Sequence, residues 1–514
     1  MRSPLLLMRK SSIGRLWSHF TCGRYRCSQA PDQKYDSDEE ASVLTKHKWD
    51  VVISGAGLAG AALACALGTS SVFAGKKVLL IERRSLRTEH EGGEGWSNRV
   101  YALTPGSKTF LEELGVWDLL PKCKVQVINR MQVWESHSDA AITFDSVTPD
   151  GVVAYDVDLP NLMDALYKRL SRLSHDIHVC SKVRVADYEL PMLQRKNFGE
   201  SCPPVRVRLQ DGCCFETRML VGADGFNSQV KKAMGIKSLQ WNYNQKSIIA
   251  TLQLAECVDN SSAWQRFLPQ GVVALLPLDS EHTSLVWSLR ADLADKLMHM
   301  DEDSFVDALN HSLVSTLFPT KDCEPLFSHS QDISGFTAQL YGLPAGAGKR
   351  NAVVDSIMSG VTSALGAVGL GTPGMQLPMR VLRVIPGSRA TFPLGMSHAT
   401  HYVLPRVALM GDAAHRIHPM AGQGANLGIG DAQGLAELLI KSVRDGNRIV
   451  PFDTLLEYET QMQRRNVPFL CAIEALVSVY QMNVAPVVLA RSFGLQLLNS
   501  LTGIKDWITC RASY

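Results

Sequence analysis

Three glycines, Gly55-x-Gly57-x-x-Gly60, have the clearest chemical meaning in the sequence. Residues 49–54 before them read as a short buried strand, and the small apolar residues 61–67 after them indicate a helix. In that context the first glycine permits a tight turn, the second lets backbone approach a pyrophosphate, and the third lets helix and strand pack closely. The positive helix N-terminus would favour the anion. The pattern therefore predicts a dinucleotide-binding unit rather than an ordinary glycine turn.

An acid completes this pattern. Glu82 ends a second apolar run, where a carboxylate can accept hydrogen bonds from a ribose. It follows Gly55 at more than the usual spacing of about 20 residues, so we expect extra residues between the helix and the second strand. The similar run Gly369-x-Gly371-x-x-Gly374 has no strand before it, and Pro373 lacks a backbone donor. We interpret that run as a loop, which leaves one dinucleotide fingerprint.

Two further acids, Asp224 and Asp412, each follow an apolar strand beside a glycine. Either one alone would be interpreted as a turn residue or a helix cap. Together with the fingerprint they fit a cofactor that lies across the carboxyl ends of the strands of one sheet, which is where such folds bind ligands.

The segment 415–426 is the densest in polar and glycine residues. His415 and His418 lie three residues apart without a third ligand, so we expect hydrogen-bonded histidines and no metal. Gly422 and Gly424 would let backbone approach a flat ring. A helix expected from about residue 426 to 440 would direct its positive end toward that ring, which favours a cofactor that becomes anionic on reduction.

Composition restricts the classes of protein to which the chain can belong. The chain has 514 residues, 46% of them hydrophobic and 20% charged, which predicts a globular protein of two to four domains or one large interleaved fold. A net charge of +2 gives no bulk basic field for nucleic acid. The 12 cysteines include no CxxC pair, which argues against zinc ribbons and suits a reducing compartment.

The two ends of the chain carry localisation signals. Residues 1–30 contain six Lys or Arg and no acid, with apolar residues at helical spacing, which predicts a mitochondrial transit peptide; a disordered basic tail is the alternative. Residues 31–48 are polar and acidic, as in a linker. Residues 475–490 are uncharged but contain Gln481, Asn483 and Pro486, so they predict a membrane-facing helix at most and no membrane span.

These motifs resemble a known family. Three of them are similar to the FAD motifs of the group A aromatic hydroxylases, the para-hydroxybenzoate hydroxylase-like flavoproteins: Gly55-x-Gly57-x-x-Gly60, Asp224-Gly225 and Gly411-Asp412 with Pro419. Residues 418–431 resemble the signature of the ubiquinone-biosynthesis hydroxylases within that group, and residues 97–100, 265–269 and 274–278 resemble its mitochondrial members. The resemblance runs from about Trp49 to the C-terminus, so the chain is identified as a member of this family.

The resemblance implies FAD as the cofactor and the following residues around it. They are Gly55, Gly57, Gly60 and Glu82 at the ADP half, Arg99 near the flavin and phosphates, Asp224 and Gly225 near the pyrophosphate, Gly411 and Asp412 at the ribityl chain, and Pro419, Gly422, Gln423, Gly424 and Asn426 along the isoalloxazine. Lys231, Asp158-Leu159 and Met462 depart from residues common in the family. No catalytic acid or base is assigned.

The family also implies the fold class, an α/β protein with a Rossmann-like FAD-binding domain interleaved with a β-sheet substrate domain, and a C-terminal helical segment. We expect the FAD-binding domain in 49–125, 150–235 and 385–450, the substrate domain in 126–149 and 236–384, and the helical region in 451–514.

The implied activity is FAD-dependent hydroxylation of the aromatic ring of a polyprenylated hydroxybenzoate-type intermediate, at ring C5, in ubiquinone biosynthesis. In this family O₂ reacts with reduced flavin to give a C4a-hydroperoxide, which hydroxylates the ring. The implied partners are ferredoxin and its reductase as electron donors and other enzymes of the pathway. The implied location is peripheral, on the matrix side of the mitochondrial inner membrane. Another FAD oxidoreductase acting on a lipid, or a flavin-holding scaffold, stays open as an alternative.

Overall fold

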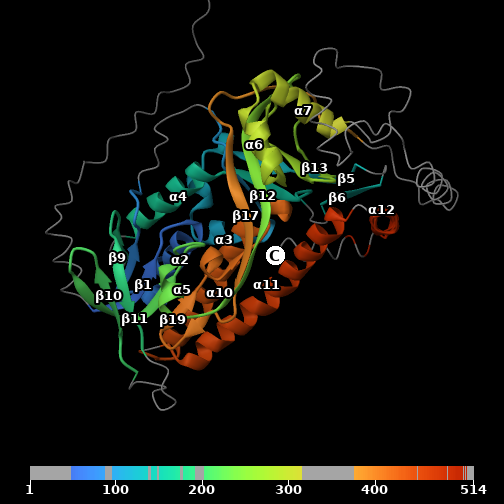
Figure 1. Ribbon diagram of the computed structural model, residues 1–514. Coiled ribbons are helices and arrows are strands. Elements are labelled where there is room, and N and C mark those ends of the chain that lie inside the picture. The colour runs from blue at the N-terminus through green and yellow to red at the C-terminus, as the bar shows by residue number, and fades with distance from the viewer. Residues whose placement is uncertain are drawn as a thin grey trace, which may run out of the picture.

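The fold contains three sheets with helices around and between them (Figure 1). The computed structural model describes residues 48–86, 95–136, 140–146, 150–173, 177–191, 202–314, 376–448, 450–482 and 484–501, with 503 and 505. The expected transit peptide, nearly all of the expected linker and the run from Gly369 to Gly374 lie outside these residues.

The first sheet contains the glycine fingerprint. Among the described residues it has eight strands: β18 (Val403–Leu404), β19 (Val407–Leu409), β11 (Cys214–Gly222), β1 (Trp49–Ser54), β2 (Val78–Ile81) and β8 (Ile177–Cys180) in that order, with β10 (Val205–Leu209) paired to β11 and β9 (Val185–Glu189) paired to β10. The run from β19 through β11, β1 and β2 to β8 is parallel. Its strands are almost continuously apolar because helices cover both faces of such a sheet.

Four helices belong with this sheet: α2 (Leu58–Thr69), α4 (Leu159–Arg172), α5 (Gln229–Ala233) and α10 (Gly424–Arg444). α2 packs against both α4 and α10, and its residues from Gly60 to Leu67 are buried. This explains why α2 is built from small apolar residues on all sides rather than on one stripe. The extra residues expected between α2 and β2 include the short 3₁₀ helix η1 (Ser71–Phe73).

The second sheet has nine strands among the described residues. They are β20 (His415–Arg416), β17 (Ala390–Ala399), β12 (Ser238–Leu254), β15 (His282–Arg290), β14 (Gly271–Pro277), β13 (Ser262–Leu268), β5 (Arg130–Glu135) and β6 (Ala141–Asp145) in that order, with β16 (Val381–Val384) paired to β12. β17 and β20 lie in the segment that the sequence assigned to the FAD-binding domain, yet they pair in this second sheet. The two sheets are therefore interleaved in the chain.

Helices cover both faces of the second sheet. α6 (Ala291–His299) and α7 (Glu302–Val314) bury Val273 and Leu275 on one face. The long helix α11 (Phe452–Gln481) buries the alternate residue Val272 on the other face, because successive side chains of a strand point to opposite sides. α12 (Ala485–Ser500) follows α11 and lies beside β6 (Figure 1).

A small third sheet lies beside α3 and α4. It consists of β3 (Val100–Leu103), β7 (Ala154–Asp158) and β4 (Val125–Ile128), all antiparallel. After β3, Thr104 caps α3 (Pro105–Glu113) by accepting from the Ser107 backbone N–H, with Pro105 in the first turn, as the sequence predicted. The 3₁₀ helices η2 (Trp117–Leu119) and η3 (Lys122–Lys124) follow.

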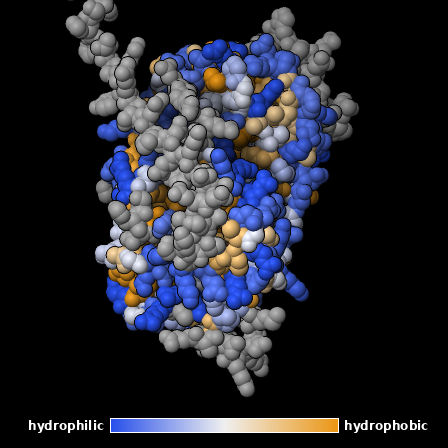
Figure 2. Space-filling view, turned by 90° about the vertical axis from the view of Figure 1, so that its left-hand side faces the viewer, coloured by the Kyte–Doolittle hydropathy of each residue, from blue (hydrophilic) through white to orange (hydrophobic). Residues whose placement is uncertain are grey.

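The outer surface is ordinary for a globular chain. Figure 2 shows mostly hydrophilic residues where the described part of this face is visible, with hydrophobic side chains in small separate groups among them. Among the described residues, none of the helices combines the length and the apolar character that crossing a membrane requires.

Candidate active site

The glycine loop between β1 and α2 is shaped for close approach of a ligand. A Cβ on Gly55, whose φ is +105°, would lie 2.4 Å from the Ala223 carbonyl oxygen, and one on Gly60 would lie 2.0 Å from the Gly55 oxygen. Both positions exclude any larger residue. Gly57 is exposed, and a Cβ there would meet no atom within 4 Å. The loop is thus packed tightly on the protein side and open on the other, which fits a dinucleotide pyrophosphate.

Glu82 is held against this loop. Its Oε2 accepts from the Ala56 backbone N–H at 2.9 Å, and its Oε1 accepts from the Arg84 N–H at 2.9 Å. Tyr167 donates to the Ala56 carbonyl at 2.9 Å and so braces the same turn. Each carboxylate oxygen keeps a lone pair beyond these bonds, so the geometry fits the predicted ribose contact.

Asp224 has a capping role that the sequence also suggested. Its Oδ2 accepts from the backbone N–H groups of Gln229 and Val230, at 2.7 and 3.4 Å, at the start of α5. Its Oδ1 is buried and has no hydrogen-bond partner among the described residues, and burial raises the pKa of this carboxyl. The neighbouring Gly225 has φ +77°. The unpartnered oxygen fits a polar ligand at this edge of the sheet.

Asp412 lies in the 3₁₀ helix η4 (Gly411–Ala413), near charged groups from two other segments. Its side chain is open to solvent but crowded by protein atoms, and this desolvation raises the pKa of the carboxyl against the opposing effect of His415, Arg416 and Lys231. Burial raises the pKa of the Tyr101 hydroxyl. The charge of Asp412 adds to this effect, and Arg99, which hydrogen-bonds to the same hydroxyl, opposes it. Arg99 and Asp412, which the sequence places far apart, are therefore brought together.

Lys231 belongs to this cluster as well. It is half-buried, and desolvation lowers the pKa of its amine although Asp224 and Asp412 lie close enough to oppose that effect. The family commonly carries an arginine here, so the cationic character is kept despite the departure. Asp224 lies beside the glycine loop, since a Cβ on Gly55 would meet its Cα at 2.8 Å. The cluster of one lysine, one arginine and two acids fits the phosphates and ribityl chain of FAD.

Asp431 is the residue that sequence reasoning left out of the site. It is fully buried in α10, and its Oδ2 accepts from the Gly411 N–H at 2.8 Å and pairs with His415 Nε2 at 2.6 Å. Its Oδ1 accepts from Asn466 of α11 at 3.1 Å. These bonds fix the η4 turn that carries Asp412. The signal was available, since Asp431 ends the 418–431 signature.

The residues around the start of α10 divide into two kinds. Gly422, with φ +62°, is exposed, and Gln423 precedes the helix without a side-chain cap. Asn426, in contrast, points into the protein. Its Oδ1 accepts from the Thr104 N–H and the Ser107 hydroxyl, and its Nδ2 donates to the Ala102 carbonyl. Asn426 therefore ties α10 to β3 and α3, and any contact with a ring would come from its backbone.

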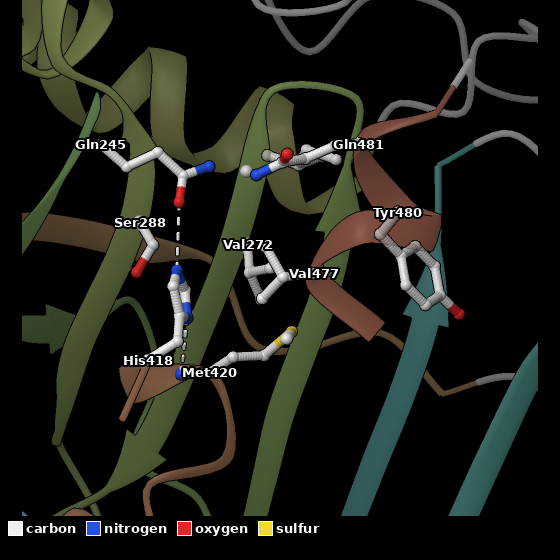
Figure 3. A pocket seen from close by; sticks show the side chains of 10 residues that line it. Gln245, Val272, Ser288, His418, Met420, Val477, Tyr480 and Gln481 are labelled. Carbon is white, nitrogen blue, oxygen red and sulfur yellow. Dashed lines mark hydrogen bonds between the residues drawn. The ribbon is translucent and has the colours of Figure 1, made fainter. Parts of the chain in front are cut away.

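A pocket lies between this segment and the second sheet (Figure 3). Its lining residues come from β12, β13, β14, β15, α11, and the 3₁₀ helix η5 (Pro419–Ala421) with the capping residue before it. They are Gln245, Leu268, Gly271, Val272, Ser288, His418, Met420, Val477, Tyr480 and Gln481. The cavity is small, about 20 Å³, and its wall is mostly apolar, with polar groups from Gln245, Ser288, His418 and Gln481.

Both histidines of the segment are hydrogen-bonded, as predicted. Burial would lower the pKa of His415, but the Asp431 carboxylate outweighs it and the net pKa is raised. Burial lowers the pKa of His418 to about 4, so that ring is neutral. His418 is therefore a weak base, and its Nδ1 lone pair accepts from the Met420 backbone N–H.

Comparison with known proteins agrees with this geometry. Residues 48–325 and 380–465 match the family model described as an FAD binding domain. The chain is 41% identical to ubiquinone biosynthesis monooxygenase COQ6, mitochondrial, of Xenopus tropicalis, over 90% of this chain and 93% of that protein. It is 39% identical to the Homo sapiens protein of the same name, over 96% and 98%.

Solved structures share the fold. Pseudomonas aeruginosa PqsL in complex with 2-aminobenzoylacetate has a TM-score of 0.60 at 20% identity and covers 87% of this chain and 99% of its own. p-Nitrophenol 4-monooxygenase PnpA from Pseudomonas putida has a TM-score of 0.58 at 15% identity, over 90% and 97%. The open glycine loop, the acid and cation cluster and these matches agree: the chain belongs to the ubiquinone biosynthesis monooxygenases, a family of FAD-dependent aromatic hydroxylases.

Proposed function

We propose that this protein hydroxylates the aromatic ring of a polyprenylated hydroxybenzoate-type intermediate, at ring C5, in ubiquinone biosynthesis. The observation that carries the proposal is the apolar pocket, with Gln245 and Ser288 at its polar end, beside the segment that begins at His418 and leads to Gly422. One oxygen atom of O₂ enters the ring and the other leaves as water, which consumes two electrons. Bound FAD supplies the oxygen activation for this reaction.

The protein's own residues hold and shield the reactants. Gly55, Gly57, Gly60 and Glu82 would hold the ADP half of FAD, and Asp412 with Arg99 the middle of the cofactor. Val477 and Tyr480 of α11 form an apolar wall over the pocket, where Tyr480 stacks on Phe267 at 3.7 Å between ring centroids. That wall would exclude water from the reacting atoms.

Electrons would come from a ferredoxin and its reductase. The sequence offers one dinucleotide fingerprint, which FAD would use. Two basic pairs, Lys231-Lys232 and Arg464-Arg465, could meet an acidic ferredoxin. Lys231 and Arg465 are half-buried, and a Cβ on Gly430 would overlap Arg465. Lys232 and Arg464 are exposed and are the cations available for such an encounter.

The protein would work on the matrix side of the mitochondrial inner membrane, peripherally and beside other enzymes of the pathway. Residues 475–504 contain a single charged residue, Arg491, and it is buried in an ion pair with Glu135. The exposed apolar side chains on and before α12 include Met482, Val484, Phe493 and Leu497. A face of this kind supports contact with lipid.

Purified mature protein supplied with ferredoxin, its reductase and ¹⁸O₂ would test the function. We expect released FAD rather than FMN, and one ¹⁸O atom in the ring of a short-chain prenylated hydroxybenzoate. Oxidised product without ¹⁸O would indicate another FAD oxidoreductase, and bound FAD without any product would indicate a scaffold. Flavin reduction by NADPH alone, equally fast without ferredoxin, would overturn the electron-donor proposal.

A further inference from the structure

The polar end of the pocket carries hydrogen-bond donors that no described residue uses. Gln245 of β12 is 7% exposed, and its Oε1 lies 3.1 Å from His418 Nε2. No described residue accepts a hydrogen bond from its Nε2, whose two N–H groups are therefore available to a ligand. Figure 3 shows this amide nitrogen on the pocket side, with the amide oxygen turned to His418.

The orientation of the Gln245 amide follows from the histidine. The Met420 backbone N–H donates to His418 Nδ1 at 3.1 Å, so Nδ1 must carry a lone pair. Since the ring is neutral, its proton sits on Nε2, which therefore donates to Gln245. The group that it meets must be the amide oxygen, and the NH₂ group is left to face the pocket.

The wall residues nearest to Gln245 supply no other hydrogen-bond donor at this end of the pocket. Ser288 donates to the Ser247 hydroxyl at 3.3 Å and so directs its proton away from the pocket. Val272, Met420 and Val477 offer only apolar contact. A flat ring in this pocket would thus meet the Gln245 amide beside His418, apolar surface from Val272, Met420 and Val477, and the Gln481 amide where α11 closes the pocket.

We propose that Gln245 binds the ring oxygen of the substrate, donating from Nε2 to the phenol or phenolate, and that His418 is the positioning residue that keeps the donor turned inward. This inference rests on the proposed function. Ring hydroxylation needs an electron-rich ring, and a hydrogen bond to the phenolate oxygen favours the ionised, more electron-rich form. Gln245 would also select rings that carry an oxygen at that position.

The test compares two soluble probes, 3-prenyl-4-hydroxybenzoate and its analogue without the ring hydroxyl, by equilibrium dialysis against the FAD-loaded protein. Wild type should bind the phenol more tightly by about 10–100-fold, the size expected for a hydrogen bond to a charged or buried group. Gln245→Leu should lose that preference while its affinity for the analogue is unchanged. Gln245→Glu keeps the acceptor for His418 but loses the donor, so it should bind the phenol more weakly still.

Two further variants separate positioning from folding. His418→Phe frees the amide and should lower the preference for the phenol, with FAD content measured in the same sample. Gln253→Glu adds the same charge on the same strand, where the side chain meets Arg383, and should bind both probes like wild type.

Unchanged discrimination in Gln245→Leu would overturn the inference even if wild type hydroxylates the phenol. Equal loss of affinity for both probes would also overturn it, because that pattern indicates damage to the pocket. If wild type binds the phenol selectively through Gln245 but forms no hydroxylated product, the proposed function fails and the binding role stands.

Discussion

At the scale of single residues, the site depends on buried hydrogen bonds as much as on the residues that would touch FAD. Asp431 and His415 form a buried ion pair that holds the η4 turn. Burial would raise the pKa of Asp431, but His415 outweighs it and the net pKa is lowered. The pKa of His415 is raised. A buried pair of this kind is costly to break when one partner is removed.

Asp431→Asn should therefore lower the free energy of unfolding by about 3–5 kcal/mol near pH 6. The raised pKa of His415 means that its contribution is complete below the unfolded value of about 6.5 and declines as the pH rises through the folded value. The lowered pKa of Asp431 means that its contribution is lost only as the pH falls through that lowered value, below about 4. Urea unfolding from pH 4 to 9 should show the alkaline decline in wild type and its absence in the variant, while Asp445→Asn, on the surface, should behave like wild type.

Asp412→Ala should lose flavin and keep the fold. The side chain is open to solvent and anchors no strand, so its removal should change the melting temperature of the flavin-free protein by less than about 3 °C. The predicted ribityl contact would be lost, and we expect FAD to bind roughly 10-fold more weakly or worse. Flavin absorbance per protein after gel filtration measures this. Full flavin content in the variant would remove Asp412 from the site; Asp118→Ala, exposed in η2, is the control.

At the scale of elements, one buried pair joins the C-terminal helices to the second sheet. Arg491 of α12 donates to Glu135 of β5 at 2.9 Å, and it also donates to the carbonyls of Val479, Tyr480 and Met482 at the end of α11. Ser492 adds a hydrogen bond to the same carboxylate. The corner between α11 and α12 is therefore fixed by one guanidinium.

Arg491→Met should release this corner. Removal of one buried partner should cost about 3–5 kcal/mol, concentrated in α12 and the end of α11. Hydrogen exchange should quicken there and stay unchanged in β1 and β11. Arg130 lies on β5, like Glu135, and forms an exposed ion pair with Asp145 of β6. Arg130→Met breaks that pair and should cost under about 1 kcal/mol. Equal effects of the two substitutions would contradict the argument.

Local elements were predictable where one short segment carries the whole signal. The strand–glycine–helix unit, the Thr104 cap and the helix after Gly424 are all present, since periodicity and capping act over a few residues. The sequence did not predict that β17 and β20 pair in the second sheet while the rest of their segment belongs to the FAD-binding domain. The residues of β17 suit a strand in either sheet, and its partner β12 lies well over a hundred residues away in sequence.

At the scale of the whole molecule, the site is built from contacts between distant segments. His418 meets Gln245 of β12, and Asn426 meets Ala102 of β3 and Thr104 just after it. The family motifs contain one partner of each contact, His418 and Asn426. The other partner has no local signature, because a glutamine within a β-strand or a backbone amide before a helix is common everywhere. The fold class and the cofactor therefore followed from sequence, whereas the ring pocket required the structure.

The proposed membrane contact belongs to this scale too. The exposed apolar side chains of α12 lie on a face without an exposed charge, since the guanidinium of Arg491 is turned inward to Glu135. Binding to lipid through such a face would come from apolar burial and would depend little on salt. The same corner borders the ring pocket through Val477 and Tyr480, so a polyprenyl tail in the bilayer could reach the ring site nearby.

Flotation of the full-length mature protein with phosphatidylcholine and phosphatidylethanolamine vesicles checks this. We expect wild type to float with the vesicles at both 0.05 and roughly 0.5 M salt, a range over which exposed charges become largely screened. Phe493→Asp with Leu497→Asp removes two large apolar contacts worth about 1.5–3 kcal/mol each, so partitioning should fall at least about 100-fold with FAD retained. Leu382→Asp, at a still more exposed apolar residue on β16, should float like wild type. Binding that high salt abolishes, or that survives the double substitution, would place the lipid contact elsewhere, because only burial of the α12 face predicts both salt resistance and sensitivity to these two side chains.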